Sequence, residues 1–219
     1  DTANIQVINV FEAAKEKLQP LYASSWDMEG AFDTVSAPIA TFAFLRLGVP
    51  SFLASWLGAL DQDSQLVLRS GHAVDAWATG GTTSIPASDR ILPTVGIGQG
   101  DVSSPLTWVV VFDMLLCAMS KVDAEGLFRL NKPSGIPYSA PDVAYADDLI
   151  SFAASLLGIQ RKADMVSLVA AILGLKIAIR KLRLLRKRWD LPSYSVPESL
   201  ILHRYMSGEV PVPFSSDSA

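Results

Sequence analysis

The chain has 219 residues, of which half are hydrophobic and 18% are charged, so it can bury a sizeable core. That composition excludes a disordered protein, and the single cysteine, Cys117, excludes an internal disulfide and a structural zinc site. The net charge is −4, although basic residues crowd into residues 180–188. Such a segment indicates either a local contact with an anion or a solvated amphipathic surface, and composition leaves both open.

The first half of the chain predicts helices around a short strand. Apolar residues at helical spacing predict a helix over residues 4–18, which ends before Pro20, and residues 21–26 predict a strand. Residues 36–60 predict two helices that are separated near Gly48 and Pro50. Residues 64–77 predict a hairpin that turns at Ser70-Gly71, and residues 78–94 are typical of a loop.

The second half begins with a long helix, predicted over residues 102–121. Its apolar stretch, residues 108–119, is too short to span a bilayer, so it predicts a buried helix with Cys117 as a core thiol. Residues 142–153 predict strand structure and residues 156–173 a helix. We expect a folded domain over residues 1–190 and an irregular, proline-rich tail over residues 191–219. The mixture predicts an α+β fold, an antiparallel sheet backed by helices.

Two adjacent carboxylates, Asp147 and Asp148, lie between strand-forming residues in the segment "DVAYADDLISF". The simplest structure is a hairpin with both residues at its tip, which is either a polar turn or a site for a divalent cation. Asp27 ends the predicted strand over residues 21–26, and Asp33 predicts a helix N-cap. A strand-end carboxylate beside a hairpin-tip pair is the arrangement that two-metal phosphoryl transfer requires.

A glycine-rich segment, "GIGQGDVSSPL", precedes the long helix at residues 96–106. Its glycines permit close backbone approach to a ligand, and the amide of Gln99 is able to contact a base or a sugar. The alternative is a plain loop before a helix. The segment lacks the lysine ending of a phosphate-binding loop and the βαβ setting of a dinucleotide-binding loop.

Taken in order, "DMEGAFDTV" (27–35), "GIGQGDVSSPL" (96–106), "YADDL" (145–149) and "GLKIAIRKL" (174–182) resemble the A to D motifs of the reverse transcriptase palm. The resemblance covers about residues 5–185 and is closest to the non-LTR retrotransposon type. It implies a polymerase palm with partial fingers and no complete thumb. It also implies an RNA-directed DNA polymerase, a nucleotidyltransferase that joins a deoxynucleotide to a primer 3′-hydroxyl with the help of two Mg²⁺ ions, for which Mn²⁺ can substitute.

The resemblance assigns catalytic and metal-binding roles residue by residue. Asp27 and Asp147 correspond to the principal metal ligands, and Asp148 completes the cluster. Lys181 corresponds to the lysine of the D motif, where a cation can donate a proton to the leaving pyrophosphate or stabilise its charge. In this motif the chain has Ala178 where the family usually has asparagine, and leucine at position 182 where the family usually has threonine.

Substrate contacts are implied at Phe32, Gln99, Gly100 and Tyr145. Phe32 corresponds to a bulky gate that rejects ribonucleotides by filling the place of a 2′-hydroxyl, with a core aromatic as the alternative. Gln99 and Gly100 correspond to residues on the nucleotide and template side, and Tyr145 to a residue near the primer end.

The implied partners are an RNA template, a DNA primer and dNTPs, without a membrane. No targeting signal is visible, so we expect an intracellular protein, in the nucleus or cytoplasm. Only 26 residues precede Asp27, the first residue is not Met, and no primer-grip hairpin or thumb is visible after the D motif, so we expect a partial chain. The alternatives are an inactive, truncated retroelement remnant that binds at most RNA or a protein, and an RNA-templated RNA polymerase, which Phe32 disfavours.

Overall fold

The computed structural model describes residues 2–60, 66–67, 90–91, 95–98, 101–122, 128–131, 134–187, 199–204 and 208–213. The chain forms two compact units. We call residues 1–31 with 111–219 the sheet unit and residues 32–110 the helical unit. The division predicted at residue 190 does not coincide with the boundary between these units.

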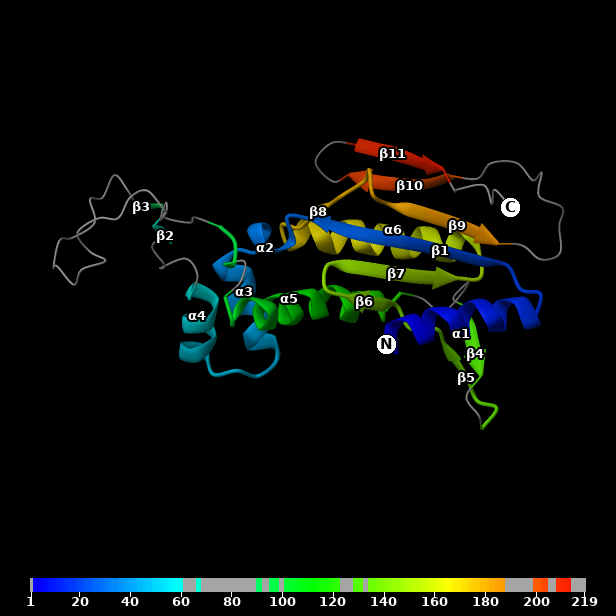
Figure 1. Ribbon diagram of the computed structural model, residues 1–219, viewed down its shortest axis with the longest axis horizontal. Coiled ribbons are helices and arrows are strands. Elements are labelled where there is room, and N and C mark those ends of the chain that lie inside the picture. Colours follow the sequence, from blue (N-terminus) through cyan, green and yellow to red (C-terminus); the bar gives the residue numbers. More distant parts are fainter. Residues whose placement is uncertain are drawn as a thin grey trace, which may run out of the picture. The chain divides into compact units, whose positions relative to one another are not determined.

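The sheet unit is built around a central strand, β1 (Leu21–Glu29). On one side β1 pairs with β7 (Asp148–Ala153), and β7 pairs in turn with β6 (Val143–Tyr145). On the other side β1 pairs with β8 (Lys176–Ile177) near its end and with β9 (Arg183–Lys187) near its start. Every pairing in this sheet is antiparallel, as predicted (Figure 1).

Alternation along β1 gives the sheet two faces. We call the face that carries Leu21, Ala23, Ser25 and Asp27 the front face, because alternate residues of a strand point to the same side. Helix α1 (Thr2–Glu16) covers the start of the front face, where Val10 and Ala14 join the same buried apolar cluster as Leu21, Ala23 and Phe152. The ring of Phe11 meets Phe152 edge to face, with 6.5 Å between centroids. Among the described residues, α1 packs on the start of this face, and we call the other end, which carries Asp27, its open end.

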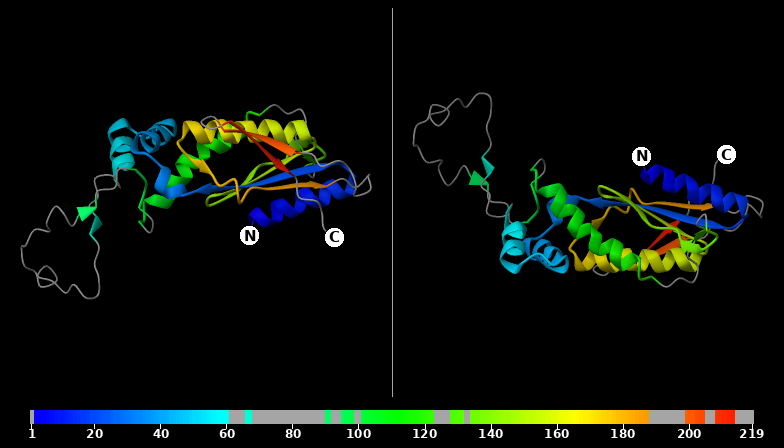
Figure 2. Two further views of the ribbon diagram at one scale, coloured as in Figure 1. Left: turned by 90° about the horizontal axis from the view of Figure 1, so that it is seen from above. Right: turned by 90° about the horizontal axis from the view of Figure 1, so that it is seen from below.

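Helix α6 (Leu156–Ile172) lies on the other face, opposite α1 (Figure 2). It contacts β1, β7 and β8. The helix begins at Ser155, whose hydroxyl accepts a hydrogen bond from the Gly158 N–H at 3.0 Å. Lys162 lies on α6, and its side chain is buried. Its Nζ lies 2.6 Å from a carboxylate oxygen of Asp142, the residue just before β6. This ion pair ties the helix to the strand that leads into the predicted carboxylate turn.

The helical unit contains two antiparallel helices, α3 (Ala37–Arg46) and α4 (Ser51–Ala59), at the predicted places. They approach closely at Gly58, where an added Cβ would collide with the backbone of Ala37 and Thr41. A short helix, α2 (Ala31–Thr34), crosses the boundary between the units. Asp33 therefore lies inside a helix, and its prediction as an N-cap is wrong.

Two strand predictions need correction. Strand β2 (Leu66–Val67) pairs with β3 (Arg90–Ile91), inside the segment predicted as a loop, and Ser70-Gly71 lies outside the described residues. Strands β10 (Ser199–Arg204) and β11 (Gly208–Pro213) pair in antiparallel fashion, so the described part of the tail is not irregular, and two paired strands follow the D motif. In the described pairing β11 has β10 as its partner on one side, so β11 is an edge strand. An edge strand tolerates proline, which has no backbone N–H to donate. A further two-stranded sheet joins β4 (Arg129–Asn131) to β5 (Pro137–Ser139).

The long apolar helix is α5 (Ser104–Met119), close to its predicted bounds. Most of its large side chains are buried, but Cys117 is exposed, so its prediction as a core thiol is wrong. The physical reason is helical geometry: Asp113 and Cys117 are four residues apart and share one polar stripe, with Sγ 3.7 Å from an Asp113 carboxylate oxygen. Across the described ranges, no helix combines the length and hydropathy that crossing a bilayer requires.

Candidate functional site

Two aspartates that are far apart in the sequence face each other at the open end of the front face. Asp27 on β1 lies directly opposite Asp148 on β7 in the strand register. Residues directly opposite each other on antiparallel strands point to the same side, with Cβ atoms about 4.5–5.5 Å apart. The Asp27 side chain is 18% exposed, and Asp148 is more accessible. The sheet therefore brings two carboxylates together at a surface that a ligand can reach.

The turn beside Asp148 differs in detail from its prediction. Tyr145 pairs with Asp148, so the loop between β6 and β7 contains only Ala146 and Asp147. Asp148 is thus the first residue of β7, and Asp147 alone shares the tip with Ala146. A two-residue hairpin of this kind needs a positive φ at its first loop position, which Ala146 adopts at 53°. The ladder holds Asp148 in place, and the tight turn keeps Asp147 beside it.

Asp27 is also held more firmly than its prediction as a strand end implied. Strand β1 continues to Glu29, and its last two residues, Met28 and Glu29, pair with β8. The Ala178 N–H donates to the backbone carbonyl of Asp27 at 2.9 Å. The segment of the predicted D motif is therefore fastened to the strand that carries Asp27.

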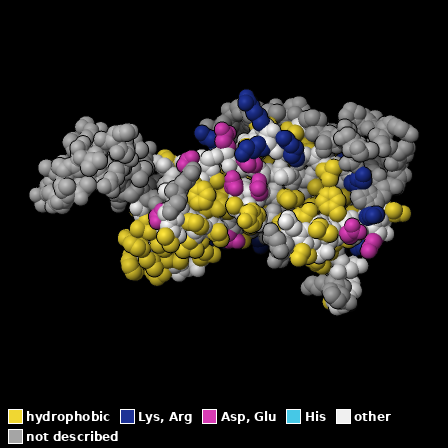
Figure 3. All heavy atoms as spheres, viewed as in Figure 1, with side chains coloured by type: hydrophobic (Ala, Val, Ile, Leu, Met, Phe, Trp, Pro, Cys, Tyr) yellow, Lys and Arg dark blue, Asp and Glu magenta, His cyan; other side chains and the backbone are white. Residues whose placement is uncertain are grey.

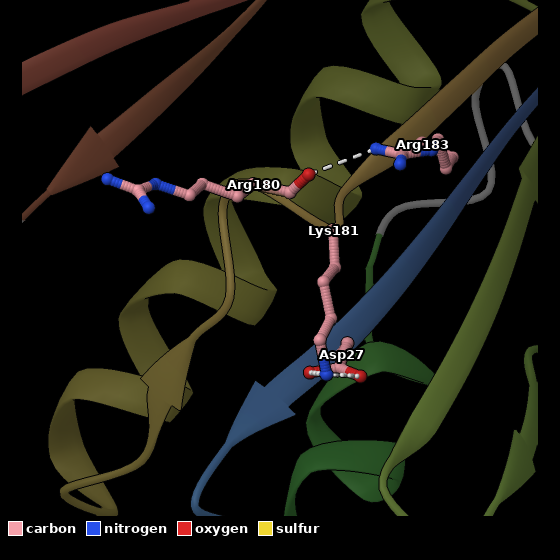
Figure 4. Close-up of polar contacts among 4 residues, drawn as sticks. All are labelled: Asp27, Arg180, Lys181 and Arg183. Carbon is pink, nitrogen blue, oxygen red and sulfur yellow. Dashed lines mark hydrogen bonds and ion pairs between the residues drawn. The ribbon is translucent and has the colours of Figure 1, made fainter.

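Lys181 contacts Asp27 across a sequence separation of 154 residues. Its Nζ lies 2.9 Å from one carboxylate oxygen of Asp27 and 3.1 Å from the other (Figure 4). The backbone N–H of Lys181 donates to the Ala178 carbonyl at 2.9 Å, and the guanidinium of Arg183 donates to the Arg180 carbonyl at 3.0 Å. The turn between β8 and β9 thus places an ammonium on the acidic site.

The electrostatics of the site favour a cation. Partial burial raises the pKa of the Asp148 carboxyl above its ordinary value of 3.8, and the negative charges of Asp147 and Asp27 raise it further. The positive charge of Lys181 lowers the pKa of Asp148. The hydrogen bond to Asp27, followed by the charge of Asp27, raises the pKa of Lys181. Carboxylates that repel each other and attract an ammonium form a set of hard oxygen donors that fits a divalent cation.

The side chains of the acidic site do not form a complete set of metal ligands among the described residues. Within the residues that the structure describes, no three His, Cys, Asp or Glu side chains lie where they could together hold a metal ion. The arrangement offers Asp27 and Asp148 as facing donors, with Asp147 in the adjoining turn. The role of all three as metal ligands stays a prediction.

A groove runs from Asp148 along the N-terminal part of α1. It has a volume of about 310 Å³ and is lined by Ala3, Asn4, Val7, Val143, Tyr145, Asp148 and Ile150. Tyr145 is 70% exposed and lies opposite Asp148 in the register, and its role near the primer end stays a prediction. Sequence reasoning missed the contribution of α1, because helical spacing shows which residues are apolar and does not show which part of the sheet they cover.

Phe32 belongs to the helical unit, where its ring packs on Trp108 with 5.9 Å between centroids. The Phe32 carbonyl accepts a hydrogen bond from the Ile97 N–H at 2.8 Å, and the Val35 carbonyl accepts one from Gly96 at 2.9 Å. Gly96 has a φ of 105°, and a Cβ there would press on the backbone of Asp33. The A and B motifs therefore pack on each other, whereas Gln99 and Gly100 lie outside the described residues.

Basic side chains gather near β8 and the start of β9, beside the acidic ones (Figure 3). Arg183 lies opposite Ser25 in the register, so it shares the front face with Asp27, and both Arg180 and Arg183 are exposed. At the far end of β9, Lys187 lines a second groove with Phe11, Glu12 and Lys15. The described part of the basic segment therefore begins at the acidic site.

Comparisons with known proteins agree with this arrangement. Residues 3–196 match the family described as "Reverse transcriptase (RNA-dependent DNA polymerase)". The chain is 25% identical over 169 residues to the Retrovirus-related Pol polyprotein from type-2 retrotransposable element R2DM of Drosophila melanogaster. That alignment covers 77% of this chain and 14% of the relative, so the chain spans a small part of the longer protein.

Solved structures with a similar fold include telomerases from two yeasts. The telomerase of Candida tropicalis, in complex with a fragment of telomeric RNA, gives a TM-score of 0.57 at 11% identity, covering 89% of this chain and 30% of that chain. The telomerase of Candida albicans, in a similar complex, gives a TM-score of 0.52 at 11% identity, covering 91% of this chain and 31% of that chain. At this identity the likeness concerns the fold alone, and it confirms the predicted α+β palm.

The motifs, the fold and the family match converge. The reverse transcriptase resemblance predicted from four ordered motifs is confirmed, and the relative from the R2 element agrees with the non-LTR type. The matched residues include Asp27, the Asp147–Asp148 turn and Lys181. The chain belongs to the reverse transcriptase (RNA-dependent DNA polymerase) family.

Proposed function

We propose that this chain is the palm of an RNA-directed DNA polymerase of a non-LTR retroelement, which extends a DNA primer with dNTPs on an RNA template. The observation that carries the proposal is the direct pairing of Asp27 with Asp148 at the open end of the front face. Membership of the family supports the class of reaction, and the pairing of Asp27 with Asp148 supports this position as the reaction site. The proposed compartment is intracellular, in the nucleus or cytoplasm.

Asp27 and Asp148 would hold the divalent cation, with Asp147 as the further ligand. We propose Mg²⁺, for which Mn²⁺ can substitute, because both prefer carboxylate oxygens. The raised pKa of Asp148 and the ammonium drawn to Asp27 support the fit. When bound, two such ions would activate the primer 3′-hydroxyl and stabilise the charge of the leaving pyrophosphate.

The other side chains of the site bind, orient and select. Lys181 would donate a proton to the pyrophosphate or offset its charge, since its ammonium already lies at the acidic site. Tyr145 would pack near the primer end, because it is exposed and lies opposite Asp148. Phe32 would exclude a 2′-hydroxyl with a ring that Trp108 braces, and Gln99 and Gly100 would contact the nucleotide and template.

A templated incorporation assay on the purified chain tests this function. Incorporation of dNTPs on an RNA template with a DNA primer is measured while Mg²⁺ is titrated. Asp27→Asn should lower the rate by about 10³-fold or more, because it removes a ligand that the reaction requires. Asp164→Asn is the matched control, since Asp164 lies on α6 and accepts a hydrogen bond from Gln160 there.

Three outcomes separate the readings. Magnesium-dependent incorporation that Asp27→Asn abolishes supports the polymerase. Incorporation that is unchanged in Asp27→Asn contradicts the site. Tight RNA binding without incorporation supports the inactive remnant, for which the unusual Ala178 and Leu182 of the D motif are the sequence evidence.

A further inference from the structure

Lys181 occupies the same oxygen atoms that a metal ion would need. Its Nζ contacts both carboxylate oxygens of Asp27, at 2.9 and 3.1 Å. A carboxylate that ligates a cation uses these oxygens, and a cation bound to them repels an ammonium that lies about 4 Å away. The ammonium and a divalent cation therefore compete for Asp27.

We propose that Lys181 is a built-in counter-ion of Asp27, which the divalent cation displaces when it binds, so that the ammonium is released towards the substrate. This inference rests on the function proposed for the site. It gives Lys181 a role before the reaction begins: the lysine neutralises the carboxylate in the absence of the metal and sets how readily the metal enters.

The ion pair between Lys181 and Asp27 can break with little loss of free energy. The Lys181 side chain is 68% exposed, and exposed ion pairs contribute little to stability because water screens them. The lysine stem has several rotatable bonds, so the ammonium can swing away without a change in the backbone. The backbone itself is fixed, because Lys181 N–H donates to Ala178 and Ala178 N–H donates to Asp27. Displacement therefore moves one side chain and leaves the turn in place.

The central test is metal affinity in the absence of nucleic acid and dNTP. Mn²⁺ is titrated into the full chain, and free Mn²⁺ is followed by electron paramagnetic resonance. Lys181→Met should tighten the Mn²⁺ dissociation constant by about twofold to fivefold, the range expected for loss of an exposed competing ion pair. Lys181→Arg should leave it near the parent value, because the guanidinium also pairs with a carboxylate.

A matched variant separates direct competition from general electrostatics. Lys176→Met removes the same charge from β8, where Lys176 is exposed and lies opposite Glu29. It should change the dissociation constant by less than about 1.5-fold, since screening weakens a more distant charge. An unchanged or weaker affinity in Lys181→Met, or equal tightening in Lys176→Met, would overturn the proposal.

A second variant distinguishes this inference from the function on which it rests. Asp27→Asn should weaken Mn²⁺ binding at least tenfold relative to the parent chain. If Asp27→Asn has no effect, the metal site itself is wrong and the competition falls with it. If Asp27→Asn weakens binding while Lys181→Met equals the parent, the site stands and only the role of Lys181 is overturned.

Discussion

Asp148 shows how much a single position depends on its neighbours. It is the first residue of β7, it faces Asp27 across the sheet, and it follows Asp147 in the turn. Partial burial and the negative charges of Asp147 and Asp27 raise the pKa of Asp148, and the charge of Lys181 offsets only part of this rise. The pairing of β1 with β7 therefore holds Asp148 beside carboxylates that repel it.

This condition predicts a pH-dependent gain in stability from Asp148→Asn. A carboxyl whose folded-state pKa is raised does not destabilise the fold below its unfolded pKa; the destabilisation grows as the pH rises from the unfolded pKa to the folded pKa and is fully present above it. In metal-free buffer, Asp148→Asn should therefore raise the free energy of unfolding at pH 7, and the gain should shrink towards pH 3.8. Urea unfolding with a chelator present measures it.

The same measurement with Mg²⁺ added supplies the control. A cation that binds only the folded chain stabilises the parent by mass action, so the advantage of Asp148→Asn should fall or reverse. A gain that is constant between pH 4 and pH 7, or that ignores Mg²⁺, would contradict the electrostatic account of this residue.

At the scale of elements, the position of β6 and its turn depends on an ion pair inside the fold. Lys162 on α6 is 2% exposed and pairs with Asp142, the residue before β6. A buried pair gains little over apolar residues of similar size, but the loss of one partner leaves a charge uncompensated away from water. The helix and the strand are thus joined by a contact that is costly to break on one side only.

Asp142→Asn and Lys162→Met should each lower the free energy of unfolding by about 3 kcal/mol, and the double variant should lose much less than the sum. Urea denaturation of the parent, both single variants and the double variant gives this cycle directly. Asp164→Asn, on the same helix, is the control and should change stability by less than about 1 kcal/mol. Strictly additive losses would mean that the two residues do not act as a buried pair.

For the whole molecule, the main feature is that each unit leaves a different kind of surface open. In the sheet unit, α1 covers one end of the front face and leaves the acidic end accessible. In the helical unit, α3 and α4 expose large apolar side chains, among them Phe42, Phe52 and Trp56. Exposed apolar surface of this kind lowers solubility and attracts other apolar surfaces.

Substitution of Phe52 and Trp56 by serine should therefore improve solution behaviour with little change in stability. Both side chains are mostly exposed, at 77% and 58%, so the double variant should unfold within about 1 kcal/mol of the parent. Binding of an apolar fluorescent dye should fall, and sedimentation should show less self-association. Ala54, which is fully buried on the same helix, offers the contrast: Ala54→Ser should leave dye binding unchanged.

Local periodicity and the order of the motifs in the sequence determined the positions of the helices and the family of this protein. Helical periodicity located α1, α3, α4, α5 and α6 within a few residues, because burial of one helix face repeats along the chain itself. Four motifs in a fixed order determined the family, and they named Asp27, Asp147, Asp148 and Lys181. Such signals need no knowledge of which distant segments meet.

Tertiary structure alone decided the contacts that make the site. The register sets Asp27 against Asp148, the turn between β8 and β9 brings Lys181 onto Asp27, and the packing of α1 leaves the acidic end of the sheet open. It also turned Cys117 outward and folded the tail into β10 and β11. Pairing between segments more than a hundred residues apart depends on the packing of the whole unit, and no local pattern in the chain encodes it.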